Sequence, residues 1–195
     1  MGKSNYSEET AIERAMVGQE DGYKYLLEKY KTYAFMIAIG IVKNEESAEE
    51  VVQDAFIRVF KHIDKFNKSS KFSTWLYRIV YNTSLTSLRG KRRIDFSSFD
   101  ERENYELDIP DNYANGFDDL VRADKITFIN KAIANLSEPE NLVVTLYYTN
   151  ECSIIEIGQI TGWNTSTIKT RLYRARQNLY IELSRLLGNE TNEIR

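Results

Sequence analysis

An all-α fold in two helical domains is the prediction from this sequence, and it rests on three observations. Only 2 prolines and 9 glycines occur in 195 residues, so the residues that typically separate strands are scarce. Apolar residues make up 42% of the chain and charged residues 28%, the balance of a globular protein rather than a disordered one. Residues 95–119 are acidic, rich in Asn and Ser and without a helical apolar repeat, which predicts an extended linker between two helical domains.

The first domain, residues 1–94, is predicted to be a four-helix-type bundle. Apolar residues at helical spacing indicate helices over residues 8–18 and 21–42. Ser47 and Glu50 have the spacing of a capping box, which predicts the start of a third helix at that point.

This third helix is expected to have one buried and one exposed face. Apolar residues recur every three or four positions from Ala48 to Ile63, and this stripe must pack against the other helices. The opposite face carries Gln53, Asp54 and Ile57. An isoleucine among polar residues indicates a partner surface, although single exposed apolar residues are common.

A polar loop over residues 67–71 precedes a fourth predicted helix that is rich in aromatic residues and cations. Phe72 and Trp75 fit the buried core better than a contact surface. Four side chains toward the other face are better candidates for contact: Tyr77, Arg78, Tyr81 and Asn82. Such a pattern suits single-stranded nucleic acid, because bases stack on rings, at about 1–3 kcal/mol each, while cations follow the phosphates. The basic residues 89–93 are either a phosphate-binding cluster or a solubilising helix end.

The second domain, beyond the linker, opens with a predicted amphipathic helix over residues 120–136. Ser137 and Glu140 form a second predicted capping box, with a proline in the first turn of the helix. Ser153 and Glu156 form a third, which opens a short helix with its isoleucines turned inward.

A turn then leads into a longer helix, the arrangement of a helix-turn-helix motif. Gly162 stands where a helix end needs positive φ, and Asn164 can cap the helix that follows. Polar donors at the start of this helix suit contact with a DNA major groove. The alternative is an ordinary helical bundle with a basic surface helix.

The charge distribution supports two nucleic-acid surfaces despite a net charge of −3. Residues 1–94 carry 16 basic and 12 acidic side chains, residues 95–124 carry 2 and 10, and residues 125–195 carry 8 and 7. Residues 65–93 contain 8 basic and no acidic side chains, and 4 basic ones lie between Glu156 and Glu182. Two basic surfaces flanking an acidic spacer indicate nucleic-acid contact, with two solvated helix faces as the plainer interpretation.

Composition also argues against several classes of protein. The longest apolar run, residues 34–42, is far shorter than the roughly 20 residues of a membrane span, and the N-terminus has no apolar signal core. One cysteine and one histidine cannot form a disulfide or a Cys/His zinc cluster. We therefore expect a cytoplasmic protein without a metal or another cofactor.

No catalytic constellation is visible in the sequence, which has no glycine-rich phosphate loop and no nucleophile elbow. His62 has no nucleophile nearby in sequence and is expected to be structural or exposed. Cys152 has no histidine in its domain to activate it. An enzyme acting on RNA or single strands is therefore disfavoured, and a stand-alone helix-turn-helix regulator would need a dimerisation helix that is not evident.

Three stretches, in this order and spacing, resemble the extracytoplasmic-function (ECF) sigma factors: AEEVVQDAFIRVF, FNKSSKFSTWLYRIVYN and SIIEIGQITGWNTSTIKTRLYRAR. The resemblance covers roughly residues 20–94 and 120–187. It implies a non-enzymatic transcription initiation factor that binds core RNA polymerase, directs it to specific promoters and promotes melting of the minus-ten element. A stand-alone helix-turn-helix DNA-binding regulator is the alternative.

The resemblance also implies roles for domains and partners. Residues 1–94 would bind polymerase and the minus-ten element, residues 95–119 would be the linker, and residues 120–195 would bind the minus-thirty-five element. The expected partners are the β′ clamp helices and β flap of core polymerase, promoter DNA and an anti-sigma factor, with no small-molecule substrate.

The same resemblance implies roles for individual residues. The expected polymerase contacts are Gln53, Asp54, Ile57 and Arg58. The expected minus-ten contacts are Asn67, Lys68, Ser69, Ser70, Lys71, Trp75, Arg78, Tyr81, Asn82 and Arg89. The expected minus-thirty-five contacts are Ser166, Thr167, Lys169, Thr170, Arg171 and Arg174. The chain departs from the family at Thr86, where an Asp is common before the retained Arg89, so a local ion pair is not expected.

Overall fold

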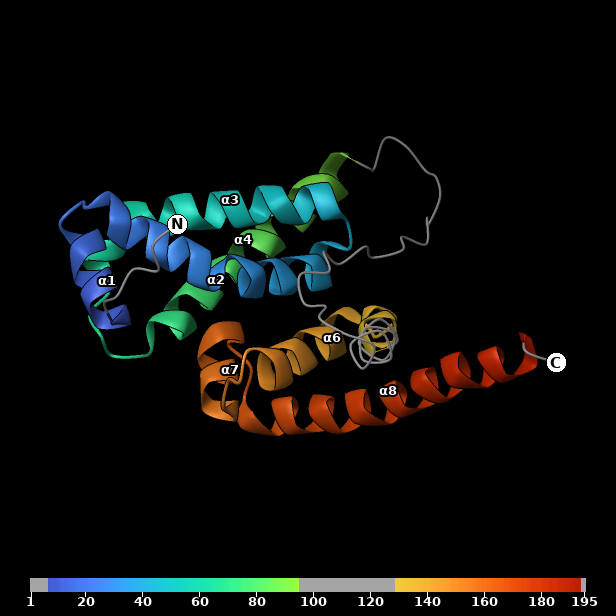
Figure 1. The fold of residues 1–195 in the computed structure, drawn as a ribbon. Coiled ribbons are helices and arrows are strands. Elements are labelled where there is room, and N and C mark those ends of the chain that lie inside the picture. Colours follow the sequence, from blue (N-terminus) through green and yellow to red (C-terminus); the bar gives the residue numbers. More distant parts are fainter. Residues whose placement is uncertain (1–6, 95–128, 194–195) are drawn as a thin grey trace, which may run out of the picture.

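The computed structural model describes residues 7–94 and 129–193, and within these ranges every regular element is helical (Figure 1). The predicted all-α class is therefore confirmed. In chain order the labelled elements are α1 (Glu8–Met16), α2 (Glu20–Val42), α3 (Glu45–Lys61), η1 (Ile63–Lys65), α4 (Phe72–Ile94), α6 (Glu138–Val144), η3 (Thr145–Thr149), α7 (Ile154–Thr161) and α8 (Thr165–Glu193). Residues 129–134 are also helical, whereas the predicted linker and residues 120–128 lie outside the described ranges.

The N-terminal bundle, residues 7–94, forms because α2 packs against α1, α3 and α4, and α3 packs against α4. Leu26 and Ile37 of α2 and Leu76 of α4 are fully buried between these helices. Each such side chain contributes roughly 1.5–3 kcal/mol through removal of its apolar surface from water.

The start of α3 differs from the prediction. Asn44 is the N-cap, and its Oδ1 accepts a hydrogen bond from the Ser47 N–H at 2.9 Å. Ser47 is 1% exposed and lies inside the first turn, where its hydroxyl donates to the same Asn44 oxygen. The predicted capping box of Ser47 with Glu50 is therefore wrong, because an asparagine caps as well as a serine and stands three residues earlier.

The C-terminal bundle, residues 129–193, consists of α6, η3, α7 and α8, with α6 and α7 both packed on α8. Ser137 is the N-cap of α6, but its side chain makes no capping bond to the backbone. Its hydroxyl donates to the Glu140 carboxylate at 2.6 Å instead, so the second predicted capping box is also wrong. After α6 the helix widens into the π-helical turn η3, which the Asn150 N–H closes by donating to the Thr145 carbonyl at 2.9 Å.

The helix-turn-helix prediction is confirmed in its local geometry. Ser153 and Glu156 form the predicted capping box at the start of α7. Gly162 ends α7 with φ of 76°, in the left-handed region that glycine adopts without steric cost. The Oδ1 of Asn164 accepts the Thr167 N–H at 2.8 Å and so caps α8. Buried apolar residues of α7 and α8 then hold the two helices together: Ile157, Ile160, Ile168, Leu172 and Ala175.

The two bundles pack directly on one another. Helix α7 lies against α4, and α6 and η3 lie against α2. In Figure 1 the N-terminal bundle is in the upper half of the view and the C-terminal bundle is in the lower half. The buried apolar residues of both bundles form one continuous cluster. None of the described helices is long and apolar enough to cross a membrane.

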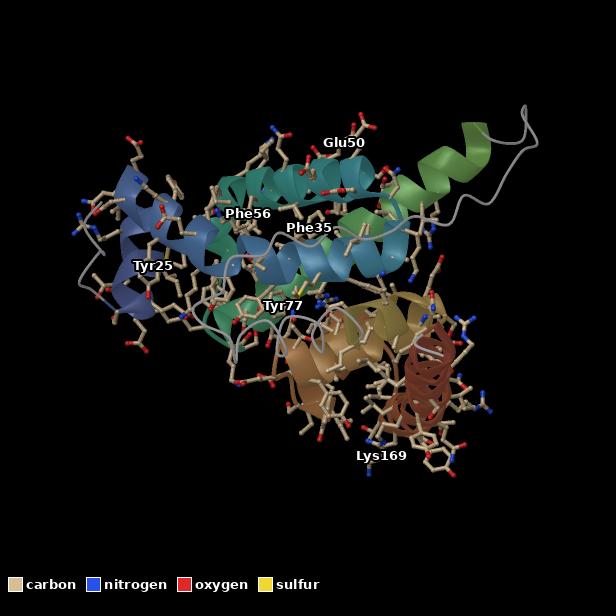
Figure 2. The ribbon with its side chains drawn as sticks, turned by 45° about the vertical axis from the view of Figure 1, so that its right-hand side comes forward. Tyr25, Phe35, Glu50, Phe56, Tyr77 and Lys169 are labelled. Carbon is tan, nitrogen blue, oxygen red and sulfur yellow. The ribbon has the colours of Figure 1, made fainter. Side chains whose placement is uncertain are left out.

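This packing corrects the expectation for Tyr77. Its side chain is only 3% exposed, and its ring lies edge-on to that of Tyr30 at 6.2 Å. Figure 2 places Tyr77 where α4 faces the C-terminal bundle. The sequence predicted a contact residue on an exposed face, but α4 is covered on a second side by α7, which widens its buried arc.

Candidate nucleic-acid and polymerase interfaces

Helix α3 presents one polar face with an apolar residue at its centre. We call it the docking face, and its side chains are all exposed: Gln53, Asp54, Ile57 and Arg58. Ile57 is 57% exposed, whereas Val51, Ala55 and Val59 on the opposite face are buried. In Figure 2 the exposed Glu50, one turn before Asp54, points outward from the molecule. An apolar side chain ringed by polar groups is the arrangement found at the centre of protein interfaces.

The loop of residues 67–71 has a defined backbone. The Oδ1 of Asn67 accepts the Ser69 N–H at 3.1 Å, and Lys68 adopts a φ of 58°. Such Asx turns tolerate a left-handed residue and hold the loop side chains outward. Four of the five residues are exposed and Ser70 is half-buried. The loop therefore presents polar groups at the surface of the molecule.

Both lysines of this loop are held by carboxylates. The Nζ of Lys68 lies 3.1 Å from Glu13 in α1, and the Nζ of Lys71 lies 2.9 Å from Glu156 in α7. Lys68 and Glu13 are both largely exposed, so this pair contributes little to stability. The hydrogen bond and charge of Glu156 raise the pKa of Lys71, which is therefore cationic at neutral pH.

The remaining predicted minus-ten residues divide between the surface and the interior of the molecule. Arg78, Asn82 and Arg89 are exposed along α4. Trp75 is half-buried against Phe66 and Phe72, which agrees with the expectation that it fits the core. Tyr81 is 8% exposed, and its ring lies 6.4 Å from that of Trp163 in the C-terminal bundle. Burial raises the pKa of Tyr81, and the cations Arg171 and Arg89 partly oppose that rise.

The predicted minus-thirty-five residues all lie on the first three turns of α8. Most of them are exposed: Ser166, Lys169, Thr170 and Arg174. Figure 2 shows Lys169 pointing away from the rest of the molecule. Thr167 is half-buried. Arg171 differs, because its guanidinium stacks 3.7 Å above the Trp163 ring and its Nη1 is buried without a hydrogen-bond partner.

Comparison with known proteins decides the family. The model of Sigma-70 region 2 matches residues 26–94, and that of Sigma-70 region 4 matches residues 129–179. The ECF RNA polymerase sigma factor SigW of Bacillus subtilis is 30% identical over 177 residues, which cover 88% of this chain and 94% of that protein. The chain belongs to the ECF RNA polymerase sigma factors.

Other relatives agree with this assignment. The ECF RNA polymerase sigma-E factor of Escherichia coli is 27% identical over 175 residues, with 88% of this chain and 91% of that protein covered. The sigma factor RpoE of Bartonella quintana, solved with the anti-sigma factor NepR, has the same fold. It superposes with a TM-score of 0.69 at 23% identity and covers 83% of this chain and 96% of that one.

As an ECF sigma factor, the protein is a transcription initiation factor that binds core RNA polymerase and promoter DNA. The resemblance found in the sequence is confirmed, and a stand-alone helix-turn-helix regulator is not favoured. The region 2 match contains the docking face, the loop and α4, and the region 4 match contains the predicted minus-thirty-five residues at the start of α8. The roles of individual residues stay predictions.

Sequence reasoning missed two residues that organise these surfaces. Glu156 was predicted only as a capping residue, and Trp163 received no role. Each contacts a predicted DNA-binding residue that lies about 80 positions away in the other bundle. No local pattern signals such a contact, because helical periodicity shows which face is buried and not what covers it.

Proposed function

We propose that this ECF sigma factor contacts core polymerase through its docking face, binds and opens the minus-ten element with the loop and α4, and binds the minus-thirty-five element with α8. The exposure of Ile57 carries the proposal, because α3 otherwise buries its apolar residues efficiently. An exposed isoleucine between Asp54 and Arg58, on a helix inside the region 2 match, fits a surface that a protein partner covers.

The proposed mechanism is differential binding, without catalysis by this chain. Arg78 and Asn82 offer charge and hydrogen bonds along α4, and the loop offers short polar side chains beside it. Unstacked bases expose edges and ring faces that a duplex hides, so this surface favours an opened strand. Tighter binding to the opened strand offsets the few kcal/mol that unstacking a base costs.

Residues 1–94 and 120–195 are proposed to be separate domains joined by the acidic residues 95–119. The two family matches, over 26–94 and 129–179, fall inside these bounds and support the division. We propose further that the protein acts in the cytoplasm, where RNA polymerase works, and that an anti-sigma factor binds it, as one binds the Bartonella relative.

The docking face is tested by the double variant Asp54→Arg with Ile57→Ala in the full-length chain. Reversing the charge and removing the apolar centre should weaken binding to cognate core polymerase at least about thirtyfold, the loss typical of an interface hot spot. Holoenzyme assembly is measured by analytical gel filtration, with helix content checked by circular dichroism.

A matched control is Glu28→Arg with Ile155→Ala, which also reverses one carboxylate charge and truncates one isoleucine, at exposed positions on α2 and α7. The control should assemble normally. Normal assembly by the Asp54/Ile57 variant would remove α3 from the polymerase interface.

A further inference from the structure

The loop of residues 67–71 is closed at both ends by buried aromatic rings. Phe66 follows η1 just before the loop, and Phe72 begins α4 just after it. Both side chains are buried, and their rings meet edge to face with centroids 5.4 Å apart. Trp75, in the first turn of α4, packs against both rings. These contacts fix the spacing of the loop ends, so the loop has a defined shape before any strand binds.

Phe72 is held in turn by a tyrosine of α2. The ring of Tyr30 lies 5.7 Å from that of Phe72, at an interplanar angle of 48°. Tyr30 is buried inside the N-terminal bundle. A buried tyrosine hydroxyl needs a hydrogen-bond partner, and the position of that partner sets the orientation of the ring.

Glu8 of α1 is the partner of this hydroxyl. A side-chain hydrogen bond joins the Tyr30 hydroxyl to the Glu8 carboxylate. Burial, followed by the bond and the charge of Glu8, raises the pKa of Tyr30, so the hydroxyl stays protonated and donates. The same carboxylate pairs with Lys29 and stands in the first turn of α1, where the helix dipole favours a negative charge. The acceptor for Tyr30 is therefore fixed in position.

Helix α1 is thereby connected to the loop by two routes. Through Glu8, Tyr30 and Phe72 it reaches the buried ends of the loop. Through the exposed pair of Glu13 with Lys68 it reaches the outer side of the loop. Helix α1 also packs on η1, and Figure 1 shows α1 and the segment between α3 and α4 at the same end of the N-terminal bundle. The region 2 match begins at residue 26, so α1 lies outside it.

We propose that Glu8 and Tyr30 are positioning residues for promoter melting: they hold Phe72, and with it the ends of the loop, in the arrangement that receives an extruded minus-ten base. This inference rests on the proposed function of the loop. Both residues act through Phe72 rather than by contact with DNA. They restrict the loop before the strand arrives, so that less of the binding free energy is spent on ordering it.

Two single variants break the hydrogen bond from opposite sides. Tyr30→Phe removes the hydroxyl and keeps the ring, and Glu8→Ala removes the acceptor. Glu8→Gln is the conservative variant, because its amide oxygen still accepts a bond from the tyrosine. Glu9→Ala is the matched control, since it removes an exposed carboxylate from the same turn of α1. Because the two residues act as a pair, the double variant Glu8→Ala with Tyr30→Phe should be no weaker than either single variant.

The measurement is binding of the holoenzyme to a single-stranded cognate minus-ten oligonucleotide, either intact or with one base removed at each position in turn. Base removal at the position that the loop holds should weaken wild-type binding by about tenfold or more. Glu8→Ala and Tyr30→Phe should bind the intact strand about three- to tenfold more weakly, within what a hydrogen bond to a carboxylate contributes, and should bind that abasic strand as wild type does. Glu8→Gln should recover most of the lost affinity, and Glu9→Ala should bind as wild type does.

A purely structural role of the pair predicts a different result, because a loss of folded protein lowers binding to the intact and abasic strands by the same factor. Equal losses on both strands, or wild-type binding by both Glu8→Ala and Tyr30→Phe, would overturn the inference. Failure of the proposed function itself is visible in the wild-type protein alone. If no base removal weakened wild-type binding, the loop would hold no base, and the inference would fall with that function.

Discussion

The side chains of Arg171 and Arg174 project from α8 about one turn apart and have different environments. Arg174 is exposed, while Arg171 stacks on Trp163 with one nitrogen buried and unpaired. A buried guanidinium nitrogen without an acceptor costs free energy, so a base or phosphate acceptor would favour release of Arg171 from the stack. At the scale of the residue, the structure therefore separates an arginine whose side chain is exposed from one whose guanidinium is stacked on Trp163.

Replacing either arginine with alanine should weaken binding of the holoenzyme to a duplex that carries the minus-thirty-five element. The expected loss is about 1–3 kcal/mol for each arginine that pairs with a base. Fluorescence anisotropy of a labelled duplex measures it, with Arg185→Ala, at an exposed position further along α8, as the control. Unchanged affinity in both variants would assign the start of α8 to a structural role.

At the scale of the element, the loop of residues 67–71 is the segment whose test distinguishes a protein that melts promoter DNA from one that only binds duplex DNA. Its Asx turn through Asn67 and the exposed Ser69 suit an extruded base. Because Lys71 also takes part in the interface with Glu156, changes at Asn67, Ser69 and Ser70 test the loop more cleanly.

We expect Asn67→Ala, and deletion of Ser69 with Ser70, to lower run-off transcription from a duplex promoter by about tenfold or more, since the loop recovers part of the few kcal/mol spent on base flipping. A template with a pre-opened minus-ten region should restore most of the yield. Holoenzyme assembly is checked separately. Equal defects on both templates would place the loop in docking or folding, and equal activity would deny it a role.

At the scale of the whole molecule, two ionisable side chains between the bundles, Cys152 and Tyr77, are buried in surroundings that favour their neutral forms. Burial raises the pKa of Cys152 to about 12 and moves the pKa of Tyr77 well above its usual value of 10.0. A pKa raised on folding gives stability that is complete below the unfolded value, 9.0 for the thiol, and is lost as the pH rises beyond it.

The free energy of unfolding should therefore stay level from neutral pH to about pH 8.5 and then fall, by up to about 1.4 kcal/mol per pH unit for each titrating group. Urea denaturation followed by circular dichroism at pH 7 to 11 measures this. Cys152→Ala should show a shallower fall between pH 9 and 10, before tyrosine titrates in the unfolded chain. A profile identical to that of wild type would mean that the thiol ionises as easily in the folded protein as in the unfolded one.

Much of the fold, and the positions of most candidate residues, follow from signals that act within four residues along the chain. The apolar repeat from Ala48 to Ile63 predicted which face of α3 is exposed, and Ser153, Gly162 and Asn164 predicted the turn before α8. Such signals succeed because capping bonds and helical periodicity are local. They fail where two local solutions compete, as at Asn44 and Ser47.

By itself, then, the sequence determined the helical class, the family and the side chains available for polymerase and DNA. Only the tertiary structure decided that Tyr77 is buried, that Tyr81 packs on Trp163, and that Lys71 is paired with Glu156. The reason is physical: the last two contacts join side chains more than 80 positions apart, and they depend on the shape of two packed surfaces, such as the fit of Gly40 against Asn141. A periodic pattern predicts which face of a helix is buried, and tertiary packing determines which other helix covers that face.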